Sequence, residues 1–391
     1  MGKRVGLEVS FAASEAVRLA NVDVIAAYPI TPQTHIVERL SEFVNNGELD
    51  AEFVPVESEH SAMSVCTGAA AVGARTFTCT SSQGLILMSE IVYCAAPMRL
   101  PVVMVLANRS LSNPISIWND HTDVMSIRDC GWIQYFAENG QDVFDHVLIS
   151  YRVGEDRDVM LPVIVNMDGF NLSHVIEPVE LLDQETVDRF LPVFKPEVVL
   201  DPARPVTMGA IVLPTCYTET KKAQDEAVKA SMPAILKIWK EFGDLTGRYY
   251  HPIEEYRTEG AKVLLVTMGG IGETAMWAVD QMREQGRSVG LLKIRLWRPF
   301  PFKEFRKVAL KAKILVVVDR AVSYGGPGGP VASELRSALY DEPKRPHVVN
   351  FIAGLASRDV APVDFIAMVD KAEGTLQKRV GPEYEIYGVR E

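Results

Sequence analysis

Cysteine is scarce in this chain, and its cysteines are far apart. The 391 residues include five of them, Cys66, Cys79, Cys94, Cys130 and Cys216, and no two form a CxxC pair. The seven histidines show neither HxxxH nor HExxH spacing. Because iron–sulfur clusters and structural zinc sites need closely spaced thiolate and imidazole ligands, the sequence predicts no metal site and no cluster on this chain.

Long apolar runs and an excess of positive charge are also missing. No run reaches the ~18 residues of a membrane-spanning helix, and the N-terminus lacks the pattern of a secretory signal. The formal net charge of −11 at pH 7 disfavours nucleic acid and anionic membrane surfaces as main partners. We therefore expect a cytoplasmic protein with no nucleic-acid or membrane partner, long enough for two domains with substantial cores.

The chain does contain a regular alternation of short apolar strands and amphipathic helices. Apolar runs predict strands at 24–27, 53–56, 75–80, 101–106, 159–165, 263–267, 289–296 and 314–319. Periodic segments predict helices at 7–20, 35–43, 85–96, 141–153, 219–243 and 331–340. This alternation is typical of parallel sheets covered on both faces. We predict two doubly wound α/β domains, at 1–200 and 259–391, joined by a connector with a helix at 201–258.

Three other stretches mark turns or connections. Proline and acidic residues at 174–205 predict an extended connector. Residues 249–258 predict a second hinge. The glycine turn from Gly269 to Glu273 resembles half of a dinucleotide fingerprint, but the later acidic residue of that motif is missing, so a tight turn between strand and helix is favoured.

The stretch at 56–84 combines a polar opening, a helix of small residues, a β-rich run and a polar turn. Its Glu59 is expected in the first helical turn, close to the carboxyl end of a strand, where open α/β sheets keep their ligand chemistry. From this stretch alone, a purely structural role for these polar residues is as compatible with the sequence as a role in ligand chemistry. In that interpretation Ser58 caps the helix, while Glu57 and Glu59 complement its dipole.

Two further loops follow predicted strands. Prolines on either side of Thr31 stiffen the loop at 28–34 and hold that threonine in place. The polar loop at 107–123 is long, and long loops in compact domains are usually functional. Arg109 lies just past its strand, where a guanidinium group could bind a substrate carboxylate; a surface arginine in a salt bridge is the alternative.

Several stretches together resemble the α subunit of the 2-oxoacid:ferredoxin oxidoreductases, of the pyruvate type. The resemblance extends nearly from end to end and spans unrelated loops. It rests on AYPITPQT (27–34), GELDAEFVPVESEHSA (47–62), ANRSLSNPISIWNDHTD (107–123), DCGWIQYFAENGQ (129–141), DGFNLSHVIEPVE (168–180) and RPFP (298–301).

The resemblance implies an oxidative decarboxylation of 2-oxo acids, pyruvate first among them. Thiamine diphosphate performs the attack on the oxo group, coenzyme A takes the acyl group, and electrons reach ferredoxin through iron–sulfur clusters. The α subunit of such enzymes supplies a pyrimidine-binding-type domain and a transketolase C-terminal-like domain. The expected assembly is a complex with β-, γ- and δ-type subunits.

The resemblance also implies roles for individual residues. Glu59 faces N1′ of the aminopyrimidine and acts in catalysis. Thr31 and Arg109 hold the carboxylate and carbonyl ends of the substrate and are counted with the catalytic residues. Further cofactor contacts are assigned to Tyr28, Pro29, Ser82 and Gln83. Asn113 is assigned to the substrate pocket, and it stands where the pyruvate-type loop commonly has alanine, which leaves branched-chain, aryl or oxalate substrates open.

The chain lacks a motif for the diphosphate and its Mg²⁺, namely GDG followed by paired asparagines. We therefore expect Mg²⁺ and the [4Fe-4S] clusters on partner subunits. For 2-oxoglutarate an additional cation near Arg109 is expected, and none occurs before Arg128. A non-catalytic α/β scaffold is the alternative outside the enzymes, but the combination of Thr31, Glu59 and Arg109 favours catalysis.

Overall fold

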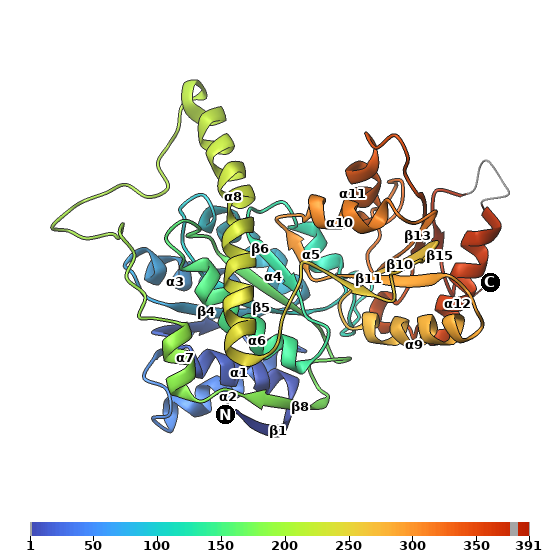
Figure 1. The fold of residues 1–391 in the computed structure, drawn as a ribbon. Helices are drawn as coiled ribbons and strands as arrows, with labels where there is room; N and C mark the ends of the chain where they lie inside the picture. Colours follow the sequence, from blue (N-terminus) through green and yellow to red (C-terminus); the bar gives the residue numbers. More distant parts are fainter. Residues whose placement is uncertain (1, 376–381, 391) are drawn as a thin grey trace.

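The computed structural model describes residues 2–375 and 382–390. Its two α/β lobes lie side by side, with the N-terminus on the first lobe and the C-terminus on the second (Figure 1). The first lobe contains a seven-stranded sheet of order β12-β6-β7-β5-β4-β2-β3, and the second a six-stranded sheet of order β15-β14-β13-β10-β11-β9. Both sheets are parallel except for one antiparallel edge strand each, β12 and β9. The predicted fold class is confirmed.

The strands of the first sheet are β2 (Val24–Ala27), β3 (Glu52–Pro55), β4 (Thr76–Thr80), β5 (Val103–Asn108), β6 (Ile133–Phe136), β7 (Val163–Asp168) and β12 (Leu296–Arg298). One face is covered by α1 (Val9–Leu19), α2 (Thr34–Asn45), α6 (Gly140–Gly154) and α8 (Pro214–Thr246). The other face is covered by α3 (Glu59–Ala71), α4 (Ser82–Ala95) and α5 (Thr122–Ser126). Because helices cover both faces, every residue of β5 is buried, as its apolar sequence predicts.

The strands of the second sheet are β9 (Ile253–Tyr256), β10 (Val263–Met268), β11 (Val289–Ile294), β13 (Ile314–Asp319), β14 (His347–Ile352) and β15 (Glu385–Ile386). Its faces are covered by α9 (Ile271–Glu284) and α12 (Pro362–Thr375) on one side, and by α10 (Phe302–Ala309) and α11 (Pro330–Leu339) on the other. The core under α10 and α11 continues into the first lobe through Trp297 and Trp132, which are fully buried. One apolar cluster therefore spans both lobes, while a second lies within the first lobe and a third within the second.

The expected extended connector at 174–205 is wrong in part. It contains β8 (Ile176–Leu181) and α7 (Gln184–Phe190), and β8 pairs with β1 (Lys3–Glu8) in a small antiparallel sheet. Pro178 is tolerated because β8 has a partner on one side only. Asp183 caps α7 by accepting a hydrogen bond from the backbone N–H of Thr186 at 2.8 Å.

The hinge expected at 249–258 and the strand expected at 289–296 also differ from the structure. The first contains β9, which pairs antiparallel with β11. The second ends at Ile294, and the chain then crosses to pair as β12 with β6 of the first sheet. Sequence patterns missed β1, β6, β8, β9, β12, β14 and β15. Several of these strands are short, and β1 and β8 are largely exposed or half-buried, so they lack a continuous apolar run.

The connector helix is longer than expected, at 33 residues. Its C-terminal half packs on the first lobe through Ile235, Ile238, Trp239 and Phe242, while its first turns extend beyond the lobe (Figure 1). The boundaries 1–200, 201–258 and 259–391 stay a prediction. Within the described residues, no helix has both the length and the apolar character needed to cross a membrane.

Candidate functional site

The predicted site residues gather at one edge of the first sheet. Because β5, β4, β2 and β3 are parallel neighbours, their carboxyl ends meet at this edge. Thr31 follows β2, Glu59 follows β3, Ser82 follows β4 and Arg109 follows β5. Residues that are up to 78 positions apart are thereby placed in adjoining loops, as the hydrogen bond between Arg109 and Thr31 demonstrates.

Glu59 is the first residue of α3 and is only 6% exposed. The helix is capped by its neighbours. Ser58 accepts a hydrogen bond from the backbone N–H of Ser61 at 3.3 Å, and Glu57 accepts one from the Ser61 hydroxyl at 2.7 Å, which lowers the pKa of Glu57. Among the described residues, the Glu59 carboxylate has no hydrogen bond or ion pair. Because burying an unpaired carboxylate is costly, capping explains Ser58 and Glu57 but leaves Glu59 available for a ligand.

Gly84 packs directly against this carboxylate. A Cβ atom at position 84 would lie 2.6 Å from Oε1 of Glu59 and closer still to Oγ1 of Thr80. The Thr80 hydroxyl is buried and has no hydrogen-bond partner in the described part of the chain. Only glycine permits this approach. The polar turn expected at 81–84 is in fact the start of α4, and its glycine serves close packing rather than flexibility.

Arg109 is also buried, at 6% exposed. Its Nε donates to the carbonyl of Ser116 and its Nη1 to the carbonyl of Thr31, both at 3.0 Å. Within residues 2–375 and 382–390, no carboxylate forms an ion pair with it, and Nη2 has no partner. Burial lowers the pKa of Arg109, and the negative charge of Asp123 opposes this change. A surface arginine in a salt bridge is therefore not what the structure contains.

The loop after β2 presents Tyr28, Pro29 and Thr31 at the surface. It is held from beneath by Gln33, which is fully buried and donates through Nε2 to the carbonyls of Tyr28 at 2.7 Å and Cys79 at 3.4 Å. Sequence reasoning did not assign Gln33 this role. Its amide sets the path of the loop that carries Thr31.

The side chains of Ser82 and Gln83 form hydrogen bonds with other residues of this chain. The fully buried Ser82 hydroxyl lies 2.6 Å from the carbonyl of Ser110 and 2.6 Å from Oε1 of Gln83. Gln83 also donates to the carbonyl of Ser112 at 3.4 Å. These bonds join the start of α4 to the 107–123 loop. Asn113 is exposed at the tip of that loop.

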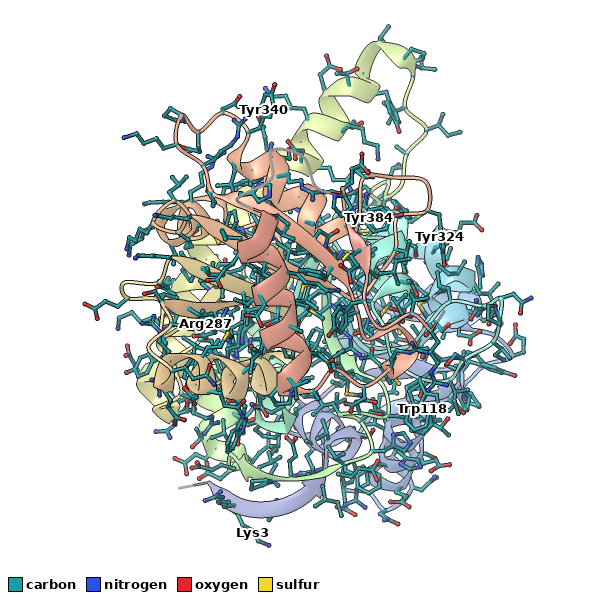
Figure 2. The ribbon with its side chains drawn as sticks, turned by 90° about the vertical axis from the view of Figure 1, so that its right-hand side faces the viewer. Lys3, Trp118, Arg287, Tyr324, Tyr340 and Tyr384 are labelled. Atoms are coloured by element: carbon teal, nitrogen blue, oxygen red, sulfur yellow. The ribbon has the colours of Figure 1, made fainter. Side chains whose placement is uncertain are left out.

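The second half of the same loop is attached to the second lobe. The backbone N–H of Asn119 donates to the hydroxyl of Ser357 at 2.9 Å, in the short 3₁₀ helix η1 (Leu355–Ser357). The N–H of His121 donates to the carbonyl of Arg320 at 2.8 Å. Trp118 lies at the edge of the molecule, on the same side as Tyr324 of the second lobe (Figure 2).

A buried charge cluster lies where the two lobes meet. Nε2 of His121 lies 3.2 Å from Oδ1 of Asp168, while Arg320 donates to Oδ2. Burial acts to raise the pKa of Asp168, but Arg320 and His121 outweigh it and lower this pKa to about 2. The N–H of Gly270 donates to Asp168 at 3.2 Å. The glycine turn is thus held against the first lobe, as a tight turn between β10 and α9.

Two family models match the chain. Residues 15–238 match the thiamine-diphosphate-binding domain of pyruvate flavodoxin/ferredoxin oxidoreductases. Residues 261–365 match core domain II of pyruvate:ferredoxin oxidoreductase. Together these matches cover both lobes.

Curated relatives are similar over almost the whole chain. Pyruvate synthase subunit PorA of Pyrococcus furiosus is 48% identical over 95% of this chain and 94% of its own length. The subunit of the same name from Thermotoga maritima is 45% identical over 100% of this chain and 99% of its own length. Ketoisovalerate oxidoreductase subunit VorA of Pyrococcus horikoshii is 42% identical over 97% of both chains.

Solved structures share the fold. A 2-oxoglutarate:ferredoxin oxidoreductase from Magnetococcus marinus superposes with a TM-score of 0.71 at 18% identity, covering 95% of this chain and 65% of that chain. A split-gene transketolase superposes with a TM-score of 0.53 at 14% identity, covering 94% of this chain and 98% of that chain. At these identities the likeness concerns the arrangement of strands and helices.

Proposed function

Because this chain belongs to the pyruvate flavodoxin/ferredoxin oxidoreductase family, we propose that Glu59 and Arg109 form its half of a thiamine diphosphate site that acts on pyruvate. The chain is the alpha subunit of an enzyme that decarboxylates a 2-oxo acid oxidatively with coenzyme A. One observation carries the assignment of the site. A carboxylate and a guanidinium group, each only 6% exposed and neither ion-paired among the described residues, lie in loops at one sheet edge.

The residues around Glu59 fit the pyrimidine end of the cofactor. The unpaired carboxylate and the unpaired Thr80 hydroxyl provide polar atoms in a buried setting. Gly84 lets the start of α4 approach both of these groups closely, because a Cβ at position 84 would overlap them. Tyr28 and Pro29 border this region from the loop after β2, whereas the bonds of Ser82 and Gln83 to the 107–123 loop give them a supporting role.

Glu59 holds a proton at N1′ of the aminopyrimidine and so favours the imino form of that ring. A buried carboxylate with no competing partner is suited to this exchange, because solvent does not weaken its contact with the ring. Bound thiamine diphosphate supplies the nucleophilic carbon and accepts the electron pair that decarboxylation releases. The contribution of this chain is to place one carboxylate and to exclude water around it.

Arg109 binds the carboxylate of the oxo acid. A guanidinium group has five N–H donors, and protein carbonyls occupy only Nε and one N–H of Nη1. The remaining donors on Nη1 and Nη2 are available to a carboxylate, which also supplies the counter-charge that the buried cation lacks. The hydroxyl of Thr31 lies on the adjoining loop, where it can donate to the substrate.

Partner subunits complete the enzyme. The complex transfers electrons to ferredoxin and acyl groups to coenzyme A, and we place Mg²⁺ and the [4Fe-4S] clusters on its β-, γ- and δ-type subunits. The chain offers no diphosphate motif and no paired cysteines, which supports this division. Pyruvate is proposed over 2-oxoisovalerate because the relatives named pyruvate synthase are more similar to this chain. Asn113, the departure from the pyruvate-type loop, is exposed, and the same assay tests whether it alters the choice of substrate.

The test is an anaerobic assay of the native complex that contains this chain. Reduction of a low-potential dye is followed with coenzyme A and one of pyruvate, 2-oxobutyrate, 2-oxoisovalerate, phenylglyoxylate or 2-oxoglutarate, and with oxalate in the absence of coenzyme A. The expected result is the highest kcat/KM with pyruvate. A higher kcat/KM with a bulkier acid would support the proposed site but would show that pyruvate is not the preferred substrate. A complex with cofactor and clusters that reduces no dye with any acid would refute the function.

A further inference from the structure

Asp123 is a fully buried carboxylate whose partners all donate to it. Oδ1 accepts from Nδ2 of Asn108 at 3.0 Å and from the backbone N–H of Val124 at 2.7 Å. Oδ2 accepts from the backbone N–H of Arg109 at 3.0 Å and from that of Ser82 at 3.2 Å. An ionised carboxylate is an acceptor only, so it satisfies four donors that no other side chain of this size could satisfy together.

These donors come from three different segments. Ser82 begins α4, Arg109 follows β5, and Val124 lies in α5. Ser82 has φ 47°, in the left-handed region that serine rarely adopts, and its N–H bond to Asp123 helps to hold that conformation. One carboxylate therefore joins the backbone that carries the guanidinium group to the turn that places Gly84 against Glu59.

We propose that Asp123 is a positioning residue that fixes the distance and orientation between Arg109 and Glu59. This inference rests on the proposed function of those two residues and adds a third to the site. Asp123 holds Arg109 through the backbone and not through the guanidinium group. The negative charge near the buried cation thus stabilises it, while its free N–H donors remain available to the substrate.

The support for Asp123 continues into the sheet. Nδ2 of Asn108 also donates to Oδ1 of Asn166 at 3.1 Å, and Nδ2 of Asn166 donates to the carbonyl of Tyr135 at 2.9 Å. All four of these residues are buried. The network thereby connects the site to β5, β7 and β6, three neighbouring strands inside the first sheet. Burial raises the pKa of Asp123, and its N–H donors act against that rise and favour the ionised form.

The experiment measures steady-state kinetics of the complete anaerobic complex with Asp123→Asn. The amide keeps the size of the side chain but presents an NH₂ group to two N–H donors, so one pair of bonds is lost. We expect the KM for pyruvate to rise by ~10-fold or more and kcat to fall, while the KM for coenzyme A stays within about twofold. Asn108→Ala, which removes the link to the sheet, should raise the KM for pyruvate by a smaller factor.

Asp145→Asn is the matched control. Asp145, on α6, is equally buried and accepts hydrogen bonds from Arg248 and Tyr250, which follow α8. Its replacement should lower Tm without changing the KM for pyruvate. Arg109→Ala is measured alongside. If that variant leaves the KM unchanged, the proposed substrate role of Arg109 fails. If it raises the KM while both Asp123→Asn and Asn108→Ala leave it unchanged, the positioning role of Asp123 is refuted. Should Asp123→Asn not assemble, Asn108→Ala alone decides between these outcomes.

Discussion

Replacing Gly84 by alanine perturbs the carboxylate of Glu59 without touching Glu59 itself. The added Cβ would lie 2.6 Å from Oε1 and 2.8 Å from Cγ of Glu59, and closer still to Oγ1 of Thr80. Ordinary contacts at such a carbon are roughly 3.5–4 Å, so the carboxylate or the start of α4 must move by about 1 Å. A displacement of that size at a catalytic group costs ~10²-fold in rate.

The effect on stability should be much smaller than the effect on rate. Overpacking a core position costs about 1–3 kcal/mol, whereas alanine is favoured over glycine in a helix by about 1 kcal/mol. The two contributions oppose each other, because Gly84 lies in the first turn of α4. A complex that is folded and assembled but ~10²-fold slower is therefore the expected result.

Gly68→Ala is the control for this experiment. Gly68 lies in α3, is exposed, and has no atom within 4 Å of the position of an added Cβ. This variant should leave kcat unchanged and raise Tm slightly. The assay is coenzyme-A-dependent dye reduction with pyruvate, with thiamine diphosphate content measured in the same samples. Wild-type kcat in Gly84→Ala would refute the close contact with Glu59 as a requirement of catalysis.

Three other predictions follow from the same geometry. Glu59→Gln should retain cofactor while kcat falls by ~10² or more, the loss typical of a general acid–base group; near-normal turnover would remove Glu59 from the mechanism. Arg109→Ala should mainly raise the KM for the oxo acid, which titration with pyruvate measures. The lowered pKa of Asp168, about 2 in the folded chain, stabilises the fold above about pH 4, and that stability is lost as pH falls toward 2. In denaturant titrations, the free energy of unfolding should fall by about 2 kcal/mol between about pH 4 and pH 2. Asp168→Asn should remove this part of the pH dependence.

Local sequence patterns predicted the central strands because their burial on both faces demands a continuous apolar run. β5 and β13 are such strands, and both were predicted within two residues of their ends. Short edge strands carry no such signal. β12 is three residues long and is a strand only because β6, a strand from much earlier in the chain, pairs with it. Its antiparallel register depends on contacts more than 160 positions apart in the chain.

The candidate site divides in the same way. Thr31, Glu59 and Arg109 could be proposed from the sequence because each follows a predicted strand within a motif of the family, and their roles stay a prediction. Gln33, Gly84 and Asp123 could not be assigned their roles, since nothing local distinguishes them from ordinary loop and helix residues. Their importance comes from the atoms that they meet, which belong to other segments.

The sequence by itself determined the class of fold, the family and the residue types available for the chemistry, because periodicity, motifs and charge are properties of neighbouring residues. Only the tertiary structure decided which of those residues are buried without a partner. A carboxylate at position 59 is compatible with a helix cap as well as with catalysis, and a guanidinium group at position 109 with a surface ion pair as well as with substrate binding. These alternatives are distinguished by the burial and the hydrogen bonds of the two side chains. Residues from several strands and from both lobes together determine that burial and those hydrogen bonds.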